Sequence, residues 1–375
     1  MRATKDSGFE WIGIIPSEWG LSRIGQVYRL RNTKVSDTDY PPLSVTNKGI
    51  VPQLDTAAKT NAHDDRKLVK KGDFAINSRS DRRGSCGISD YDGSVSLINT
   101  ILAPLNEMNP GYYDWLFHTV QFGDEFYKFG HGIVDDLWTT GWQEMKKITI
   151  PTPPLSEQKR IADFLDAKCA EIDALTADIQ AQIDTLEQYK RSVITETVTK
   201  GLNPDTETKD SGVQWIGNMP AHWDVIRGKY ILRYMQKPVR EDDGVITCFR
   251  DGEVTLRSNR REDGFTMSDK EIGYQGIDVG DLVVHGMDGF AGSIGISDSR
   301  GKASPVLNVL DTDQHKRYIM YYLRSMAYSD VFLALATGIR VRSCDLRWNK
   351  LAELSYPVPP LDEQNAIVKH IDSVL

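Results

Sequence analysis

The chain has 375 residues, of which 40% are hydrophobic and 26% are charged, a composition typical of a globular protein and not of a disordered or membrane-embedded one. No apolar run reaches the roughly 18 residues of a spanning helix, the N-terminus lacks a signal-peptide core, and the four cysteines are scattered, so we expect a cytoplasmic protein without disulfides or bound zinc. The net charge of −8 argues against indiscriminate nucleic-acid binding, although a local basic face remains compatible with it.

Residues 1–154 are predicted to form a mixed α/β globule. Short β-like runs broken by glycine, such as Asp73–Asn77, precede a helical candidate that extends from Tyr112 to Phe129.

One long helix is predicted from Leu155 to Lys200, because these 46 residues contain no glycine or proline. Ser156 is expected to be its N-cap, and Gly201 is expected to end it. Apolar side chains recur every seven residues and form a seam on one face, at Leu165, Ile172, Ile179, Leu186 and Val193. A heptad seam flanked by charges favours one strand of a coiled coil over an ordinary buried helix, so the seam is expected to pair with another helix.

The rest of the chain repeats the first part. Lys5–Gly13 returns as Lys209–Gly217, and Pro151–Gln158 returns as Pro357–Gln364. We therefore predict a tandem repeat with four segments: a globule at residues 1–154, a spacer helix at 155–201, a second globule at 202–360, and the start of a second spacer helix at 361–375. The second globule also contains a β-like run, Asp281–His285, and a helical candidate from Tyr318 to Leu335.

The second helix has no counterpart of the region after Cys169. If it folds back antiparallel on the first, it reaches only the region near Leu186 and Val193 and leaves Leu165, Ile172 and Ile179 exposed. This predicts either self-association through the seam or a missing partner segment.

No motif in the chain supports covalent chemistry. There is no GxxxxGK[ST] phosphate loop, no Asn- or Asp-Pro-Pro-aromatic tetrapeptide of an amino-methyltransferase, and no helical pair of histidines suited to a metal. In the glycine-rich run 289–295, Gly292 and Gly295 match Gly84 and Gly87, which favours recurring turns over a nucleotide cradle. We expect a protein without catalysis, metal or cofactor of its own.

Recognition of duplex DNA fits two similar globules joined by a spacer, since DNA presents sites at fixed separations. Basic charge is concentrated in the second half: residues 227–261 contain nine basic and five acidic side chains, and residues 316–350 contain seven and two. Arginine can pair with guanine edges or phosphates, and asparagine can pair with adenine. The candidate contacts in the first globule are Asn47, Lys48, Asn77, Arg79, Ser80, Arg82 and Arg83, and those in the second are Arg250, Arg257, Asn259, Arg260, Arg261, Arg340 and Arg342. The alternative for each loop is a solvated turn whose charges neutralise one another.

Two segments carry a resemblance to a known family. They are Ile15–Trp19 and the run from Ile150 to Ile161 that precedes the long helix, and both halves of the chain carry versions of them. They resemble the characteristic segments of the specificity subunits of type I restriction-modification systems, and the similarity extends over essentially the whole chain.

The resemblance implies two target-recognition domains, each reading one half of a bipartite DNA site, with two antiparallel helices setting the gap. It also implies two modification subunits along the helices, which carry S-adenosylmethionine and methylate adenine, and restriction subunits that use ATP. Two alternatives remain open: a free-standing DNA-binding regulator, for which the seam has little purpose, and a scaffold that binds proteins and no DNA, which leaves the arginine clusters unexplained.

Overall fold

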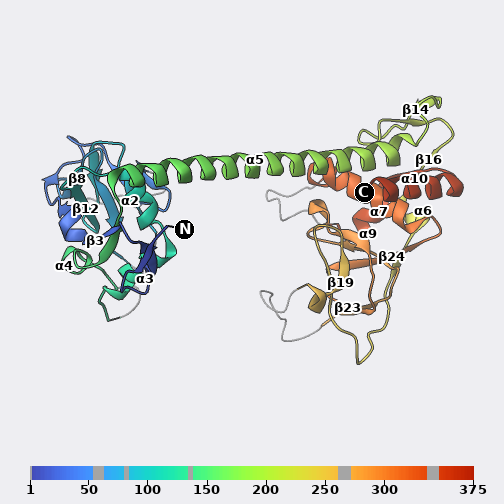
Figure 1. The fold of residues 1–375 in the computed structure, drawn as a ribbon. Helices are drawn as coiled ribbons and strands as arrows, with labels where there is room; N and C mark the ends of the chain where they lie inside the picture. Colours follow the sequence, from blue (N-terminus) through green and yellow to red (C-terminus); the bar gives the residue numbers. More distant parts are fainter. Residues whose placement is uncertain (1, 54–62, 80–83, 134–137, 261–271, 336–345) are drawn as a thin grey trace. The chain divides into compact units, whose positions relative to one another are not determined.

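The computed structural model describes residues 2–53, 63–79, 84–133, 138–260, 272–335 and 346–375, and the chain divides into two compact units, residues 1–178 and 179–375 (Figure 1). The elements before the long helix are β1 (Thr4–Asp6), β2 (Ile14–Pro16), β3 (Gly20–Arg23), α1 (Ile24–Val27), β4 (Tyr28–Leu30), β5 (Lys34–Val35), β6 (Leu43–Thr46), β7 (Gly49–Pro52), β8 (Arg66–Val69), β9 (Phe74–Asn77), β10 (Cys86–Ile88), β11 (Gly93–Val95), β12 (Asn99–Pro104), α2 (Pro110–Phe117), α3 (Val120–Lys128), α4 (Trp142–Met145) and β13 (Thr149–Thr152).

The long helix α5 (Leu155–Lys200) is followed by the elements of the second unit. These are β14 (Thr208–Asp210), β15 (Asn218–Pro220), β16 (Asp224–Arg227), α6 (Gly228–Ile231), β17 (Leu232–Met235), β18 (Ile246–Cys248), β19 (Val254–Leu256), η3 (Arg257–Asn259), β20 (Gln275–Ile277), β21 (Leu282–His285), η4 (Gly289–Ala291), β22 (Ile294–Ile296), β23 (Gly301–Ala303), β24 (Leu307–Thr312), α7 (Lys316–Tyr328), α8 (Val331–Ala334), α9 (Trp348–Glu353), β25 (Ser355–Val358) and α10 (Leu361–Val374).

A four-stranded antiparallel sheet forms the centre of each unit, and the two sheets have the same strand order. The order is β10-β9-β12-β4 in the first unit and β22-β21-β24-β17 in the second. The smaller pairs also correspond: β1-β2 with β14-β15, β3-β13 with β16-β25, and the hairpin β6-β7 with β18-β19. The mixed α/β class is confirmed, and the matching order is the topology that the sequence repeat predicts.

The core of the first unit lies between this sheet and the helices α2 and α3. Phe74 on β9 packs against Phe117 on α2, with ring centroids 4.5 Å apart, and Phe117 packs against Phe122 on α3 at 4.6 Å. Asn109 caps α2 by accepting a hydrogen bond from the backbone N–H of Tyr112. In the second unit α7 takes the place of α2 and is buried along most of its length.

Each predicted helix next to the sheet is in fact two helices. The candidate from Tyr112 to Phe129 breaks at His118–Thr119, where the Thr119 side chain caps α3 by accepting from Phe122 N–H. The corresponding break in the second unit is at Asp330, whose backbone is left-handed (φ +55°). Threonine favours caps over helix interiors because its side chain competes for backbone hydrogen bonds, whereas Asp330 precedes α8 without a side-chain cap hydrogen bond.

The long helix has the predicted bounds, Leu155–Lys200, and Gly201 ends it with φ +75°. The expected N-cap at Ser156 is wrong. The carbonyl of Pro154 accepts hydrogen bonds from Glu157 and Gln158, so the cap position lies two residues before Ser156, and Ser156 lies in the first turn of the helix.

The repeated Glu-Gln pair joins each globule to a helix. Glu157 accepts hydrogen bonds from Trp19 Nε1 (3.0 Å) and from the Arg2 guanidinium (2.5 and 2.6 Å). Its repeat Glu363, on α10, accepts from Trp223 Nε1 (3.1 Å) and contacts His222 Nε2 (2.8 Å). The tryptophans near the start of each repeat are therefore packing anchors.

The two glutamines that follow these glutamates, Gln158 and Gln364, also join each globule to its helix. Gln158 accepts from the backbone N–H of Asn109 (3.0 Å) and donates to the carbonyl of Pro153 (2.8 Å). Gln364 accepts from His315 N–H (2.9 Å) and donates to the Pro359 carbonyl (2.8 Å). The motif that carries the sequence repeat is thus a structural joint.

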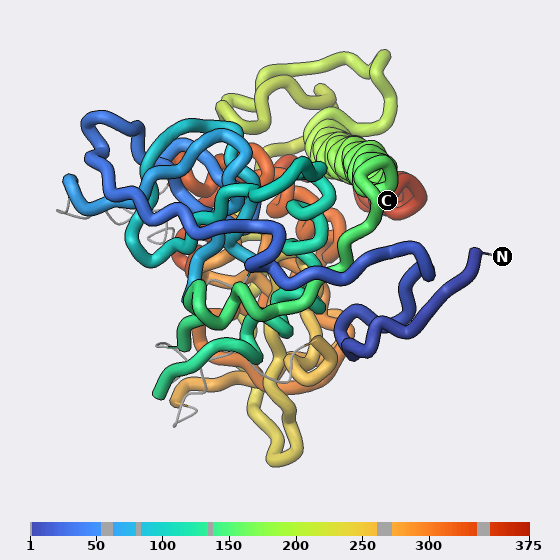
Figure 2. The backbone as a smooth tube through the Cα atoms, turned by 60° about the vertical axis from the view of Figure 1, so that its left-hand side comes forward, coloured from blue at the N-terminus to red at the C-terminus, as the bar shows by residue number. Residues whose placement is uncertain are grey.

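Within the second unit, α10 returns along the end of α5 (Figure 2). Glu363 in its first turn lies beside Gly201, and Leu375 lines the same groove as Lys190 and Ile194. Ile194 and Val198 are fully buried, and the Tyr318 hydroxyl of α7 donates to the Val198 carbonyl (3.1 Å).

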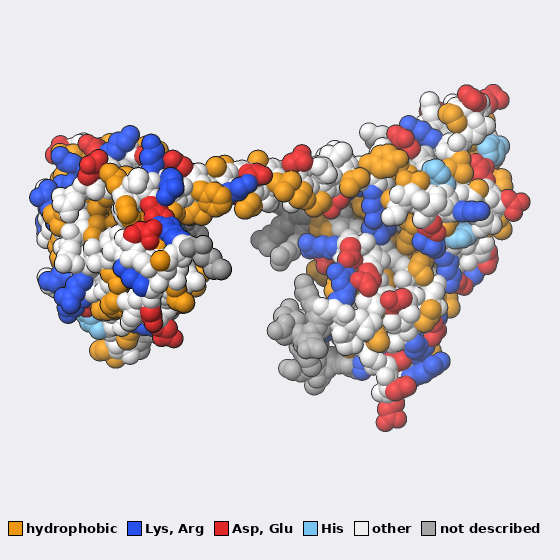
Figure 3. Space-filling view, viewed as in Figure 1, with side chains coloured by type: hydrophobic (Ala, Val, Ile, Leu, Met, Phe, Trp, Pro, Cys, Tyr) orange, Lys and Arg blue, Asp and Glu red, His pale blue; other side chains and the backbone are white. Residues whose placement is uncertain are grey.

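The two seam residues near the end of α5 are less buried than expected. Leu186 is 65% exposed and Val193 is half-buried, because α5 must contact α7 as well as α10 and turns Ile194 and Val198 toward both. The remaining seam is open: Ile172 is 60% and Ile179 is 47% exposed, whereas Leu165 is half-buried. Leu175, Ile183 and Tyr189 extend the exposed apolar stripe, visible along α5 in Figure 3.

No helix in the described parts of the chain has both the length and the apolar character needed to cross a bilayer.

Glycine 123 allows a test of the packing in the first unit. It lies inside α3, and a Cβ built on it meets no atom within 4 Å. Gly123→Ala is expected to raise stability by about 1 kcal/mol, because glycine costs this much in a helix interior. Thermal unfolding of the full chain should show a midpoint higher by about 2–4 °C for this gain.

Gly87→Ala serves as the control, since its Cβ would lie 2.8 Å from the Gly49 Cα and would force the backbone apart. It is expected to lower the midpoint. A lower midpoint for Gly123→Ala would contradict the packing described for α3.

Candidate nucleic-acid interface

The candidate residues belong to corresponding positions of the two units. Asn47 and Lys48 form the exposed turn of the hairpin β6-β7, and Arg250 lies in the turn of the corresponding hairpin β18-β19. Asn77 is the last residue of β9, and Arg79 lies in the loop that follows it. Arg257 and Asn259 lie in η3, and Arg260 follows it. Ser80, Arg82, Arg83, Arg261, Arg340 and Arg342 lie outside the described residues.

In each unit, one contact between two glycines allows the hairpin turn to lie close to the central sheet. Gly87 on β10 lies so close to Gly49 that a Cβ would be 2.8 Å from the Gly49 Cα, and Gly295 on β22 meets the backbone of Gly252 in the same way. Gly84 and Gly292 are indeed turns, with φ +74° and +94°. The predicted turns at Gly87 and Gly295 are wrong: these glycines lie within strands and permit the close approach of the hairpin.

In the first unit, the loop after β9 is held at its base by the segment before α4. Thr140 N–H donates to the Ser78 carbonyl (3.0 Å), and Arg79 forms a β-bridge with Thr139. Asn77 is 9% exposed, and its Oδ1 accepts a hydrogen bond from Arg79 N–H (3.0 Å). Asn77 thus shapes the loop from below, whereas Arg79 is exposed.

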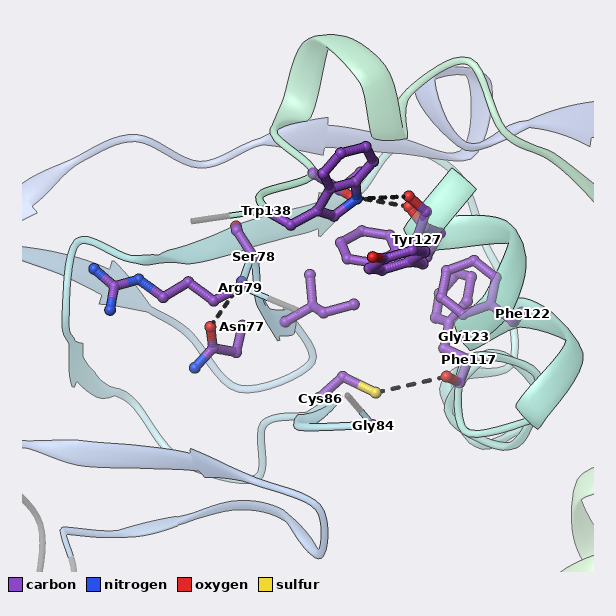
Figure 4. Close-up of a pocket in the computed structure, with 13 residues that line it drawn as sticks. Asn77, Ser78, Arg79, Gly84, Cys86, Phe117, Phe122, Gly123, Tyr127 and Trp138 are labelled. Atoms are coloured by element: carbon purple, nitrogen blue, oxygen red, sulfur yellow. Dashed lines mark hydrogen bonds between the residues drawn. The ribbon is translucent and has the colours of Figure 1, made fainter. Parts of the chain in front are cut away.

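A small aromatic cavity lies under this loop (Figure 4). Its volume is about 30 Å³, and Phe117, Phe122, Phe126, Tyr127 and Trp138 contribute most of its apolar wall. Trp138 stacks on Tyr127 with centroids 5.3 Å apart and donates from Nε1 to the Tyr127 carbonyl (2.9 Å). The Arg79 side chain points away from the cavity, so the aromatic cluster supports the loop and leaves the guanidinium outside.

The cavity also contains the Cys86 thiol, which is not a reactive group. Burial raises the pKa of Cys86 to about 12, and its Sγ donates to the Phe117 carbonyl (3.7 Å).

The corresponding loop of the second unit has different chemistry. His285 replaces Asn77, and its Nδ1 accepts from the backbone N–H groups of Met287 (3.2 Å) and Asp288 (2.9 Å). Burial, opposed by Asp288, lowers the pKa of His285, in keeping with its acceptor role. The described loop residues, 286–292, include no arginine, and Phe290 packs against the core.

In the second unit the cations surround the hairpin turn instead. Arg250 has a side chain 69% exposed and pairs with Asp288 (3.0 Å). Arg260 lies 4.2 Å from the Phe249 ring centroid and contacts the carboxylates of Asp251 (2.7 Å) and Glu253 (2.9 Å). Because two carboxylates hold Arg260, it offers less free charge to a phosphate than Arg250 does.

The two other candidates of this region are held by threonines. Arg257 Nε donates to Thr247 Oγ1 (3.2 Å), and Asn259 Nδ2 donates to Thr255 Oγ1 (2.8 Å).

Sequence reasoning missed one group of cations. Lys190 and Arg191 on α5 face Arg324 on α7 across a groove that Arg250 also lines. Arg324 lies in the basic stretch 316–350, but nothing in the sequence connects it to α5, which precedes it by more than a hundred residues. Only the fold brings these side chains together.

Within the described residues, no three His, Cys, Asp or Glu side chains are grouped as a metal site. The exposed cations, amides and hydroxyls of the two units suit contacts to phosphates and base edges.

Comparison with known proteins shows similarity in sequence and in fold. A family model for the type I restriction modification DNA specificity domain matches residues 16–185. The type I restriction enzyme MjaVIII specificity subunit of Methanocaldococcus jannaschii is 30% identical over 250 residues, which cover 62% of this chain and 54% of that protein. The chain spans about half the length of the curated relatives it matches.

Two solved structures have a similar fold. The HsdS subunit from Thermoanaerobacter tengcongensis aligns with a TM-score of 0.55 at 16% identity, over 98% of this chain and 91% of that one. A chain solved in work on complex assembly and conformational transition of the type I restriction-modification system aligns with a TM-score of 0.66 at 16% identity, over 96% and 90%. At this identity the likeness establishes the fold, with a strand-rich region before α5 and another after it.

The structural role of Asn77 can be tested by stability. Asn77→Ala is expected to lower the free energy of unfolding by about 0.5–1.5 kcal/mol, since it removes the hydrogen bond that the buried Asn77 side chain accepts from Arg79 N–H. Asn47→Ala, in an exposed turn, is expected to change it by no more than about 0.5 kcal/mol. Chemical denaturation of the full chain measures both, and equal effects would contradict the assignment of Asn77 to the base of the loop.

Proposed function

Because the chain belongs to the family of type I restriction-modification DNA specificity subunits, we propose that it selects the DNA sequence for such a complex and catalyses no step itself. The observation that carries the proposal is the pairing of one scaffold with two different sets of exposed cations. The scaffold is repeated in strand order and in the Glu-Gln joint, whereas the loops that project from it differ in their charged residues.

Each unit is proposed to read one half of a bipartite site in double-stranded DNA. In the first unit the candidate contacts are Arg79, with Arg82 and Arg83, and the hairpin turn at Asn47 and Lys48. In the second unit they are Arg250, Arg257, Asn259 and Arg260, with Arg261, Arg340 and Arg342. Asn77 is proposed to act through the position of Arg79, because it is buried beneath the loop.

The proposed division of the chain has recognition domains at residues 1–154 and 202–360. The spacer is the helix at residues 155–201, with the helix that starts at residue 361 running antiparallel to it. The placement of Glu363 beside Gly201 and of Leu375 beside Lys190 supports this direction.

The spacer is also proposed to bind other subunits. Two modification subunits, which would carry S-adenosylmethionine, are expected to dock along it, and restriction subunits that use ATP complete the system. The exposed stripe from Ile172 to Tyr189 supports docking, since large apolar side chains on one helix face favour a partner. Self-association through the same stripe is the second use open to it.

The proposal is tested by selecting bound sequences from a random duplex pool, with the chain alone and with its methyltransferase subunit. A two-part motif with a fixed gap, found mainly in the complex, is the expected result. A single motif bound equally well by the chain alone would indicate a free-standing regulator, and no motif in either sample would indicate a protein scaffold.

The loop after β9 should control one half of this motif. Replacement of Arg79, Arg82 and Arg83 by glutamine is expected to remove the sequence preference of one half-site and to leave the other half and the folding intact. The same selection measures the change. The matched variant Arg250→Gln, with Arg257→Gln and Arg260→Gln, is expected to remove only the other half, and loss of both halves in either variant would contradict independent reading.

The apolar seam of α5 is expected to be required for binding of the methyltransferase subunit or of a second copy of the chain. Ile172, Ile179 and Leu186 are exposed, so their joint replacement by glutamine is expected to leave thermal stability unchanged while the methyltransferase subunit, or a second copy, no longer binds. Ala170, Ala177 and Ala181 lie on the opposite face of α5, and their replacement by glutamine is the control. Sedimentation of both variants with and without the methyltransferase subunit gives the result, and assembly that survives in the seam variant excludes the seam as the docking face.

A further inference from the structure

A polar groove lies between the C-terminal part of α5 and the second globule. Its volume is about 610 Å³, and it is lined by the α5 residues Glu187, Lys190 and Arg191, by the end of α7, and by the turn of the hairpin β18-β19. All of these residues lie in the second unit.

The groove holds two guanidinium groups against one aromatic ring. The Arg191 guanidinium lies 5.4 Å from the centroid of the Tyr328 ring, and that of Arg324 lies 5.6 Å from it. Arg324 also donates from Nε to the Tyr328 hydroxyl (2.8 Å) and from Nη2 to the Asp251 carbonyl (2.7 Å). These acceptors are neutral, so they fix the position of Arg324 without cancelling its charge.

Three carboxylates, Glu187, Asp251 and Asp330, line the groove together with four cations, Lys190, Arg191, Arg250 and Arg324. Asp251 pairs with Arg260, outside the groove, at 2.7 Å. Glu187 contacts Arg191 at 3.7 Å, a distance that leaves a weak pair on an exposed helix. In the described part of the chain, no ion pair is formed by Lys190 or Arg324. The groove therefore presents pre-positioned positive charge.

Its position extends the recognition surface. Arg250 lines the groove and also belongs to the hairpin turn proposed to contact the second half-site. A strand of DNA bound at that turn has the groove beside it, in the direction of α5. Arginines stacked on an aromatic ring and a flexible lysine are suited to phosphate oxygens, which carry no sequence information.

We propose that Lys190, Arg191 and Arg324 bind phosphates of the DNA backbone next to the second half-site. This inference rests on the proposed function. It gives the spacer helix a contact with DNA in addition to its part in assembly, and it assigns the contact to the face formed with α7, not to the apolar seam.

The test uses the full chain in complex with its methyltransferase subunit. Lys190→Gln with Arg191→Gln removes two exposed charges of α5, and Arg324→Gln is a separate variant because its side chain also supports the hairpin turn. Binding to duplexes with and without the selected motif is measured between about 50 and 200 mM salt, the range in which phosphate contacts dominate.

The double variant is expected to bind both duplexes more weakly by the same factor, and the slope of log affinity against log salt should fall by about one for each phosphate that is no longer neutralised. Lys200→Gln with Lys369→Gln removes the same charge from exposed positions of the same unit that do not line the groove, and should leave the slope unchanged.

Three other results overturn the inference. An unchanged slope in the double variant removes the groove from the DNA surface, a changed motif assigns it to base reading, and failure to bind the methyltransferase subunit assigns it to protein docking. The wild-type complex is measured in the same series. Absence of any motif there overturns the proposed function, whereas a motif together with an unchanged slope overturns only the groove.

Discussion

The joint between a tryptophan, a glutamate and the start of a helix is the constraint on which the rest of the molecule depends. Glu157 is almost completely buried, and it is tolerated there because Arg2 and Trp19 supply its hydrogen bonds. The hydrogen bond from Arg2 is the main reason why the pKa of Glu157 lies below its ordinary value. An ionised carboxylate in this position is costly to leave unpaired, so Glu157 fixes the first globule to α5. Glu363 forms the matching bonds in the second unit from a half-buried position.

The adjacent glutamine extends this constraint to the sheet. Gln158 connects the first turn of α5 to Asn109, which caps α2, and α2 in turn packs on β9 through Phe117. The loop after β9 is therefore held, through one continuous series of packed and hydrogen-bonded groups, to the helix. A loop that reads a sequence needs such support, because a guanidinium displaced by a fraction of a hydrogen-bond length loses its bidentate geometry.

The helices and strands of the scaffold could be predicted from the sequence, whereas the conformation of the loops could not. The bounds of α5, the strands β9 and β21 and the repeat were predictable, because they follow from the absence of helix breakers, from hydrophobic patterning and from self-similarity. The breaks at Thr119 and Asp330 were not, since both lie within helical patterns and are decided by caps and by tertiary packing. Asn77 has a side chain of the type that contacts adenine, yet the fold buries it. Residue type alone does not distinguish a buried residue at the base of a loop from an exposed residue in it.

The face of α5 that packs at its end was also beyond the sequence. A heptad pattern predicts one partner helix, but Ile194 and Val198 face both α7 and α10, and this turns the buried face away from Leu186. The same rotation opens the groove at Lys190 and Arg191, because side chains three and four positions before Ile194 lie beside α7 without being covered by it. Packing of one helix against two others does not produce a simple heptad pattern in the sequence.

The negative net charge of the chain makes the positions of these local cations important for DNA binding. With a net charge of −8, the protein as a whole is repelled by DNA, so a duplex gains free energy only where arginine and lysine side chains are held in place against it. Binding at random positions brings the duplex near acidic surface as often as near basic surface. In our proposal, binding in register brings the duplex to the hairpin turn, to the loop after β9 and to the groove beside α5. The repulsion that disfavours the first arrangement therefore increases the advantage of the second, and specificity arises from the background charge as much as from the contacts.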